Sequence, residues 1–133
     1  MKKKTIVLFH AFTAAFGAFV VGLNLGGMSG AIDLIEAEFS LSSLSKGLVT
    51  ASLMVGCLFG ALFGGRLSDR YGRKPMLMIS ALILAVSAAG SAFLSYSAAP
   101  LVAFRLVGGL GVGVLSAVIP TYITEISPAE MRG

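Results

Sequence analysis

Residues 47–95 consist of GLVTASLMVGCLFGALFGG, then RLSDRYGRK, then PMLMISALILAVSAAGSAFLS. Two long runs without a charged side chain therefore flank nine residues that carry five charges. An α-helix needs about 20 apolar residues to cross a hydrocarbon core of roughly 30 Å, and each run supplies about that number. The pattern predicts two membrane-spanning helices joined by a short charged turn.

The rest of the chain repeats this pattern in both directions. Four charge-poor runs, at about 5–28, 47–65, 75–95 and 100–122, contain only one of the 16 charged residues, Arg105. The whole chain is 56% hydrophobic and 12% charged, against roughly 25% charged in an ordinary soluble domain. Alternating strands of about ten residues are absent, which argues against a barrel. We therefore predict an all-α membrane protein with four transmembrane helices in a single membrane segment, residues 1–133.

The composition excludes several classes of function. One cysteine cannot form a disulfide framework, and the single His10 has no clustered partner with metal-ligand spacing. Six acids and one histidine do not assemble into a catalytic constellation, so no enzyme activity and no cofactor is predicted. A net charge of +4 would suit nucleic acid, but the basic residues are confined to short loops. The predicted partner is the lipid bilayer, with no nucleic acid.

The basic residues predict the orientation of the four spans. Eight of the ten fall on one side of the membrane: Lys2, Lys3, Lys4, Arg66, Arg70, Arg73, Lys74 and Arg132. The opposite side holds Lys46 alone. The positive-inside rule places the N-terminus and the turn at 66–74 in the cytoplasm of a multi-pass protein of the plasma (inner) membrane.

A cleaved signal peptide over residues 1–17 is an alternative for the first run. Lysines precede an apolar segment there, and Ala15-Phe-Gly17 has the small-x-small pattern of a cleavage site. The run nevertheless continues to residue 28, beyond the length of a signal-peptide core. Three further spans remain under either interpretation.

Glycines recur at a spacing that favours close helix packing. Gly56, Gly60 and Gly64 lie four residues apart in the second run, and Gly109 and Gly113 do so in the fourth. Small residues at this spacing let helix backbones approach closely in a medium that supplies no hydrophobic drive. We predict that these glycines lie at helix interfaces.

Arg105 is unusual because a cation within a span is costly. It lies five residues past Pro100, about 8 Å from the end of its run by helical rise. Asn24 lies at a comparable depth in the first run, so its side-chain carbonyl is a candidate acceptor if the two helices are neighbours. The alternative is that the arginine snorkels to the outer surface.

The charged turn contains more than an orientation signal needs. Gly65 would permit close helix approach, and Gly72 would permit a positive φ in a tight turn. Asp69 lies among Arg66, Arg70 and Arg73, where it can form a charge network or meet the positive N-terminal end of a neighbouring helix.

The exit from the fourth run supplies a candidate partner for that turn. Pro120 interrupts the run near its predicted cytoplasmic end, and Glu125 follows five residues later. Glu125 is thus placed to pair with arginines of the turn. A solvated surface charge is the alternative that these residues alone leave open.

Two motifs resemble the sugar porters of the major facilitator superfamily. Residues 65–74 match every specified position of the loop motif G-x-x-x-D-R-x-G-R-[RK]. Residues 107–113 with Pro-x-Tyr-x-x-Glu-Ile-Ser-Pro-x-x-x-Arg-Gly at 120–133 are similar to the sugar-porter signature. Residues 22–24 and 29–31 resemble the family's G-Y-[DN] and S-G-A, with Leu23 in place of the usual aromatic. The resemblance extends over the whole chain.

The resemblance implies roles for individual residues. A cytoplasmic gating network that latches the outward-facing state would comprise Gly65, Asp69, Arg70, Gly72, Arg73, Lys74, Glu125 and Arg132. Arg105 would be the fourth-helix arginine that pairs with a first-helix acid in proton-coupled members. Asn24 occupies the place of that acid, as in facilitative members, and an amide cannot titrate.

The resemblance also implies a larger architecture. Sugar porters are twelve-helix carriers in which two halves alternate access to a site near the midplane, and this chain matches the first four helices. We expect a fragment of a sugar or polyol carrier whose C-terminal half is missing here. The alternative is a membrane sensor or interaction protein that does not transport, or a truncated remnant.

Overall fold

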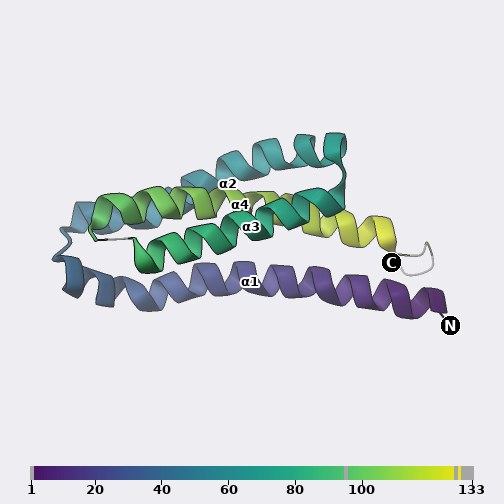
Figure 1. Ribbon diagram of the computed structural model, residues 1–133, viewed down its shortest axis with the longest axis horizontal. Helices are drawn as coiled ribbons and strands as arrows, with labels where there is room; N and C mark the ends of the chain where they lie inside the picture. Colours follow the sequence, from purple (N-terminus) through teal and green to yellow (C-terminus); the bar gives the residue numbers. More distant parts are fainter. Residues whose placement is uncertain (1, 95, 128, 130–133) are drawn as a thin grey trace.

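The computed structural model describes residues 2–94, 96–127 and 129 and forms four long helices over that part of the chain (Figure 1). The helices are α1 (Lys2–Phe39), α2 (Ser43–Tyr71), α3 (Arg73–Phe93) and α4 (Ala98–Ile126). Each contains a segment long and apolar enough to cross a membrane. The predicted all-α architecture with four spans is confirmed.

Successive helices run in opposite directions. The start of α1, the α2–α3 turn and the last turns of α4 lie together at one end of the bundle (Figure 1). We call this the basic end, because it carries the charged turn at 65–74. The opposite end holds residues 40–42, between α1 and α2, and residues 94, 96 and 97, between α3 and α4. The arrangement agrees with the predicted alternation of spans.

The first helix continues well beyond its apolar run, to Phe39. Its last turns are amphipathic, and Ile32 and Ile35 pack against a small buried cluster of Val49 and Leu101 at the opposite end. Packing of this apolar stripe explains why the helix persists through a stretch with three acids. The helix stops where Ser40 takes a left-handed conformation with φ of 49°.

The start of α2 is fixed by local hydrogen bonds and ion pairs. The Ser42 side chain accepts from the backbone N–H of Ser45 at 3.3 Å, so Ser42 is the N-cap of α2. Lys46 then reaches back to α1, where its Nζ lies 2.6 Å from Glu36 Oε2 and 3.1 Å from Asp33 Oδ1. These contacts tie the extension of α1 beyond its apolar run to α2.

The centre of the bundle is a backbone-to-backbone contact between α2 and α4. A Cβ at Gly56 or Gly60 would overlap the backbone of α4 near Leu110, and one at Gly109 or Gly113 would overlap the backbone of α2. The predicted glycine interface is confirmed. No side chain larger than hydrogen fits at these four positions without moving a helix.

The first helix is held more loosely. It meets α4 through a cluster of Ala14, Leu115 and Ile119, but it hardly touches α3 in the described part of the chain. A groove of about 700 Å³ lies between α1 and α3, with a mainly apolar lining that includes Phe16 and Leu84. One face of α4 therefore lies towards α1, and the rest of α4 packs closely against α2 and α3.

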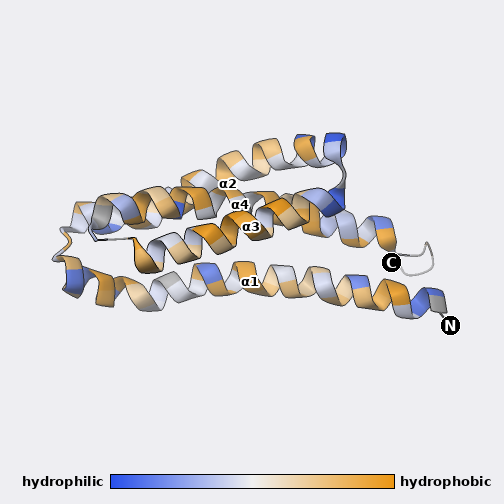
Figure 2. Ribbon diagram, in the orientation of Figure 1, coloured by the Kyte–Doolittle hydropathy of each residue, from blue (hydrophilic) through white to orange (hydrophobic). Residues whose placement is uncertain are grey.

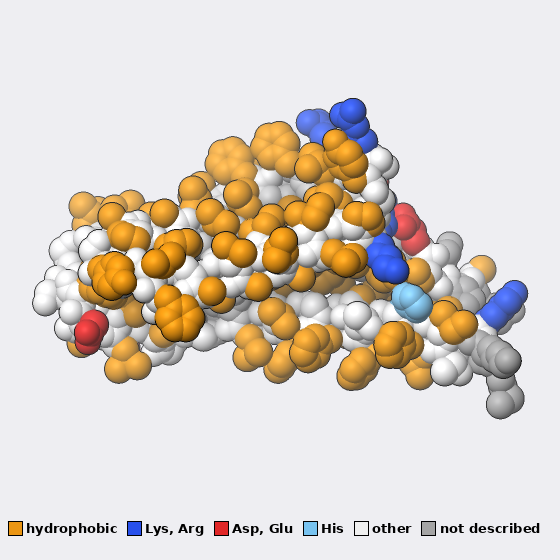
Figure 3. Space-filling model, viewed as in Figure 1, with side chains coloured by type: hydrophobic (Ala, Val, Ile, Leu, Met, Phe, Trp, Pro, Cys, Tyr) orange, Lys and Arg blue, Asp and Glu red, His pale blue; other side chains and the backbone are white. Residues whose placement is uncertain are grey.

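Apolar side chains cover the outside of the bundle. Hydrophobic residues dominate the length of all four helices, and the blue segments gather towards their ends (Figure 2). In the space-filling view most of the Lys and Arg side chains lie at the basic end, beyond an extended apolar surface (Figure 3). Phe9, Phe12 and Phe93 are each more than two-thirds exposed. Such a surface suits hydrocarbon or further apolar helices.

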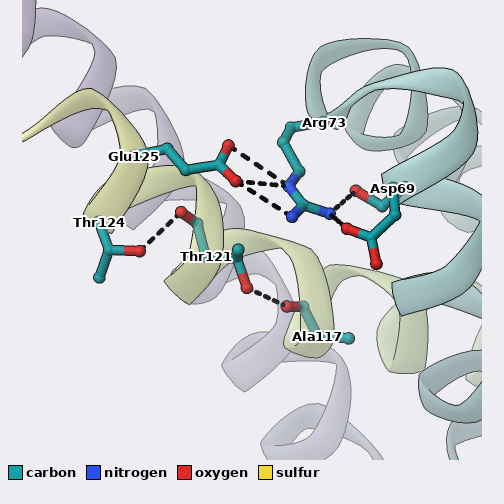
Figure 4. Close-up of polar contacts among 7 residues, drawn as sticks. Asp69, Arg73, Ala117, Thr121, Thr124 and Glu125 are labelled. Carbon is teal, nitrogen blue, oxygen red and sulfur yellow. Dashed lines mark hydrogen bonds and ion pairs between the residues drawn. The ribbon is translucent and has the colours of Figure 1, made fainter.

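The last turns of α4 follow a proline. Pro120 lies inside the helix and has no N–H to donate to the carbonyl four residues earlier. Beyond it, the Thr121 hydroxyl donates to the Ala117 carbonyl at 3.1 Å and Thr124 donates to the Thr121 carbonyl at 2.8 Å (Figure 4). Both bonds stay within α4, and neither takes the place of the backbone bond that is missing at Pro120.

Candidate functional site

The charged turn places Arg73 at the first residue of α3. Helix α2 ends at Tyr71, and Gly72 links the two helices with φ of 97°. The Gly72 N–H donates to the Ser68 carbonyl at 2.9 Å, which closes the end of α2. Because L side chains rarely adopt this φ, the predicted need for glycine at 72 is borne out.

Arg73 joins three helices at the basic end. Its Nη1 lies 2.6 Å from Asp69 Oδ1 on α2, and its Nη2 lies 3.1 Å from Glu125 Oε1 on α4 (Figure 4). Its Nε donates to the same carboxylate at 3.2 Å. The arginine side chain is about one-fifth exposed, and both acids are more exposed. One guanidinium thus bridges two carboxylates from different helices.

A fourth residue of this network was not anticipated from the sequence. Ser68 is 1% exposed, and its hydroxyl accepts from Arg73 Nη1 at 2.9 Å. The motif leaves this position unspecified, so the sequence carried no signal for it beyond a small polar residue beside Asp69. By accepting this hydrogen bond, the buried hydroxyl helps to orient the guanidinium.

Other residues of the predicted network lie apart from it. The guanidinium of Arg70 lies 5.6 Å from the ring centroid of its neighbour Tyr71. Lys74 lines the groove between α1 and α3. Neither forms an ion pair with a described carboxylate. Arg132 lies outside the described residues.

The expected role of Gly65 in close helix approach is wrong. A Cβ at this position would meet nothing within 4 Å among the described residues. Gly64 carries the contact instead, because a Cβ there would press against Val114 of α4 at 2.9 Å. The stripe of every fourth glycine, rather than the first residue of the loop motif, faces α4.

The second candidate site lies between α1 and α4. Arg105 Nη1 donates to Asn24 Oδ1 at 3.4 Å, so the two helices are neighbours and the residues share a depth. Both side chains are partly buried and line one cavity of about 510 Å³. The arginine therefore turns inward towards α1, which disfavours snorkelling to the surface.

The described residues offer no site for a metal ion, since no three His, Cys, Asp or Glu side chains cluster there. The basic-end network holds α2, α3 and α4 together by charge-assisted bonds that a moving helix can break and remake. The second site presents a cation and an amide to a cavity inside the bundle.

Comparison with known proteins identifies the family. The family model described as "Sugar (and other) transporter" matches residues 10–133. The chain belongs to this family. The chain is therefore part of a multi-pass membrane protein of the major facilitator superfamily, as the loop motif and the signature predicted.

Curated relatives in bacteria are similar over nearly all of this chain. The arabinose-proton symporter of Bacillus subtilis is 41% identical over 96% of the chain and 27% of the relative. The D-xylose transporter of Levilactobacillus brevis is 39% identical over 98% of the chain and 28% of the relative. The chain thus spans about a quarter of the length of these transporters.

Solved structures of a sugar transporter share the fold. The proton:xylose symporter XylE bound to 6-bromo-6-deoxy-D-glucose superposes with a TM-score of 0.88 at 28% identity, covering 98% of this chain and 33% of that one. The inward-open xylose transporter XylE from E. coli gives 0.86 at 29% identity, covering 96% and 34%. The four helices match part of one half of this transporter family's fold.

Proposed function

We propose that this chain forms part of an alternating-access carrier of sugars or related polyols. The family membership and the names of the relatives support this proposal, and the rest of the carrier would supply the remaining helices and most of the solute contacts. In this proposal the basic end faces the cytoplasm, as the distribution of Lys and Arg favours, and lipid surrounds the apolar exterior. The work of the protein is then conformational and not chemical.

The basic-end network is proposed as the cytoplasmic latch. Arg73 holds Glu125 of α4 and Asp69 of α2 at once, so separation of these helices at this end must break a bridged ion pair. In the proposed cycle the latch is closed in one orientation of the carrier and released in the other. Gly72 shapes the turn that presents Arg73, and Arg70 and Lys74 act at the membrane surface.

We further propose that the carrier is facilitative, or is coupled to an ion elsewhere. The observation that carries this is the contact between Arg105 and Asn24 at 3.4 Å. A carboxylate at 24 would change charge with pH and pass a proton, whereas an amide keeps the same charge across the physiological range. Proton coupling through this pair then has no carrier.

Solute uptake with and without a pH gradient tests this proposal. The full-length protein in proteoliposomes should take up arabinose, xylose or glucose down a concentration gradient, and any accumulation caused by an alkaline interior should not depend on Asn24. The Asn24→Asp variant restores a titratable group and should make uptake depend on pH. Strong gradient-driven accumulation that is abolished by changing Asn24 would refute the facilitative mechanism, and absence of uptake of any sugar or polyol would refute the substrate class.

A further inference from the structure

Arg105 is a cation without a counter-charge in the described part of the chain. Asp33 and Glu36 engage Lys46 at the opposite end, and Asp69 and Glu125 engage Arg73 at the basic end. Asp33 lies nine residues beyond Asn24 on α1, about 13 Å along the helix. Within the described residues no carboxylate comes within 4 Å of Arg105.

The hydrogen bonds of Arg105 are also incomplete. Its Nε is buried and has no partner among the described residues. Its one hydrogen bond to the described residues, from Nη1 to Asn24 Oδ1, is 3.4 Å long, whereas charge-assisted N–H···O bonds are usually about 2.7–2.9 Å. A guanidinium has five donors in a fixed plane, so several of them remain available to another acceptor.

The space beside the guanidinium is lined by donors and apolar groups. The cavity of about 510 Å³ has four polar side chains, from Asn24, Ser87, Ser91 and Arg105, and no carboxylate. The Ser87 hydroxyl donates to the Phe104 carbonyl at 2.5 Å and is occupied. Ser91 lies one turn further along α3 and, with the amide NH₂ of Asn24, adds donors to those of Arg105.

We propose that this cavity binds a small anion against Arg105. The required chemistry is a single negative charge on a compact acceptor, as in chloride or in the carboxylate of a solute. A charge buried in an apolar surrounding is costly unless it is paired, and an anion here would neutralise the guanidinium and accept from its Nε. Anion binding in this cavity is separate from sugar transport and does not depend on which sugar is carried.

Asn24 determines whether the cavity holds an anion. An aspartate at this position would place a fixed carboxylate beside Arg105 and supply the missing charge from within the chain. The amide leaves the guanidinium positive and the cavity electrostatically attractive to anions. The same residue that removes a proton carrier therefore creates the anion site.

Chloride NMR of the chain in lipid nanodiscs tests the site. Exchange of chloride with a bound state broadens its quadrupolar resonance, so the wild-type chain should show excess linewidth over empty nanodiscs. Arg105→Gln should lose most of that excess because the charge is gone. Asn24→Asp should lose it as well, although Arg105 is still present, because the new carboxylate takes the place of the anion. Added gluconate should compete, and added arabinose, which is neutral, should not.

The matched control is Arg66→Gln, the same substitution at an exposed arginine of the charged turn. It should keep the excess linewidth. Retention of the excess in Arg105→Gln, or its loss in Arg66→Gln, would assign the binding to surface charge and overturn the proposal. If Arg105→Gln loses helical circular dichroism, Asn24→Asp decides the matter: unchanged linewidth in that folded variant would also overturn it. These outcomes are separate from sugar uptake, so either proposal can fail alone.

Discussion

Glycines of α2 lie against the backbone of another helix, whereas several glycines of α1 lie beside open space. Gly56 and Gly60 of α2 face the backbone of α4 so closely that no Cβ fits, whereas a Cβ at Gly22 or Gly26 of α1 would meet nothing within 4 Å of the described residues. Along α2 the helices interlock, and along α1 cavities and side chains intervene. The α2–α4 pair is thus the rigid scaffold, and α1 forms the side of the bundle where space remains for a solute or for further helices.

Alanine at a glycine position gives the largest expected difference between the two helices. Gly60→Ala should destabilise the fold by about 1–3 kcal/mol, because the added methyl must push α2 away from the Leu110 backbone. Gly22→Ala should be neutral or stabilising by up to about 1 kcal/mol, since it raises helix propensity without a clash. Unfolding by SDS in mixed micelles, followed by circular dichroism, measures both. Equal losses at the two positions would show that the space beside each glycine does not govern the change in stability.

Removing the bridge at the basic end should affect transport more than folding. Arg73→Gln in the proposed full-length carrier breaks the contacts to Asp69 and Glu125 and should lower turnover by roughly 5-fold or more, the lower range of typical conformational coupling. Arg70→Gln at the same end, which breaks no ion pair in the described structure, should have a smaller effect. Sugar uptake normalised to folded protein in the membrane gives the measurement.

A double-mutant cycle tests whether Arg73 and Glu125 act as a pair. If they do, combining Arg73→Gln with Glu125→Gln should slow uptake little more than the worse single change. Additive losses would indicate that the two residues act through separate contacts.

Loss of a hydrogen bond between α3 and α4 should lower the stability by a smaller amount. Ser87→Ala removes the donor to the Phe104 carbonyl and should cost about 0.6 kcal/mol, the mean for bonds between helices in a membrane protein. Ser80→Ala is the matched control, because among the described residues that buried serine bonds only within its own helix, to the Met76 carbonyl. The same SDS titration compares them. A larger loss for Ser80 would show that burial, and not the link between helices, governs the response.

The ion pairs at the opposite end should contribute least. Lys46 is one-third exposed and Asp33 is mostly exposed, so water and salt screen their attraction. Lys46→Gln should cause only a slight shift in the SDS midpoint, and raising the salt concentration should remove the difference from wild type. A large shift that persists at high salt would mean that α1 is fixed at this end more firmly than the exposed contacts indicate.

The sequence predicted the features that depend on composition and on spacing. The four charge-poor runs predicted four helices, and the glycines at every fourth position predicted the α2–α4 interface, because both follow from what a lipid surrounding demands of a helix. The matched depths of Asn24 and Arg105 placed them in one cavity once α1 and α4 proved to be neighbours. The pairing of Glu125 with the charged turn was also anticipated, although which arginine it would meet was not.

Features set by the rotation of a helix about its axis were beyond the sequence. The direction of Arg70 towards Tyr71, the empty space beside Gly65 and the burial of Ser68 beneath Arg73 all depend on which face of α2 meets α4. The extension of α1 to Phe39 was missed for another reason. Its acids break the apolar run, and the stripe that packs against α2 and α4 is visible only once those helices are in place.

Pro120 divides α4 into two parts that differ in how firmly they are held. On one side the helix is interlocked with α2 through Gly109 and Gly113, and on the other it carries Glu125 to the bridge with Arg73. Because one backbone hydrogen bond is absent at the proline, the last turns of α4 bend more easily than the part of the helix before it. Residues 121–126 can then move away from Arg73 while the preceding part of α4 stays packed against α2. Amide hydrogen exchange should therefore be faster at 121–126 than at 106–115.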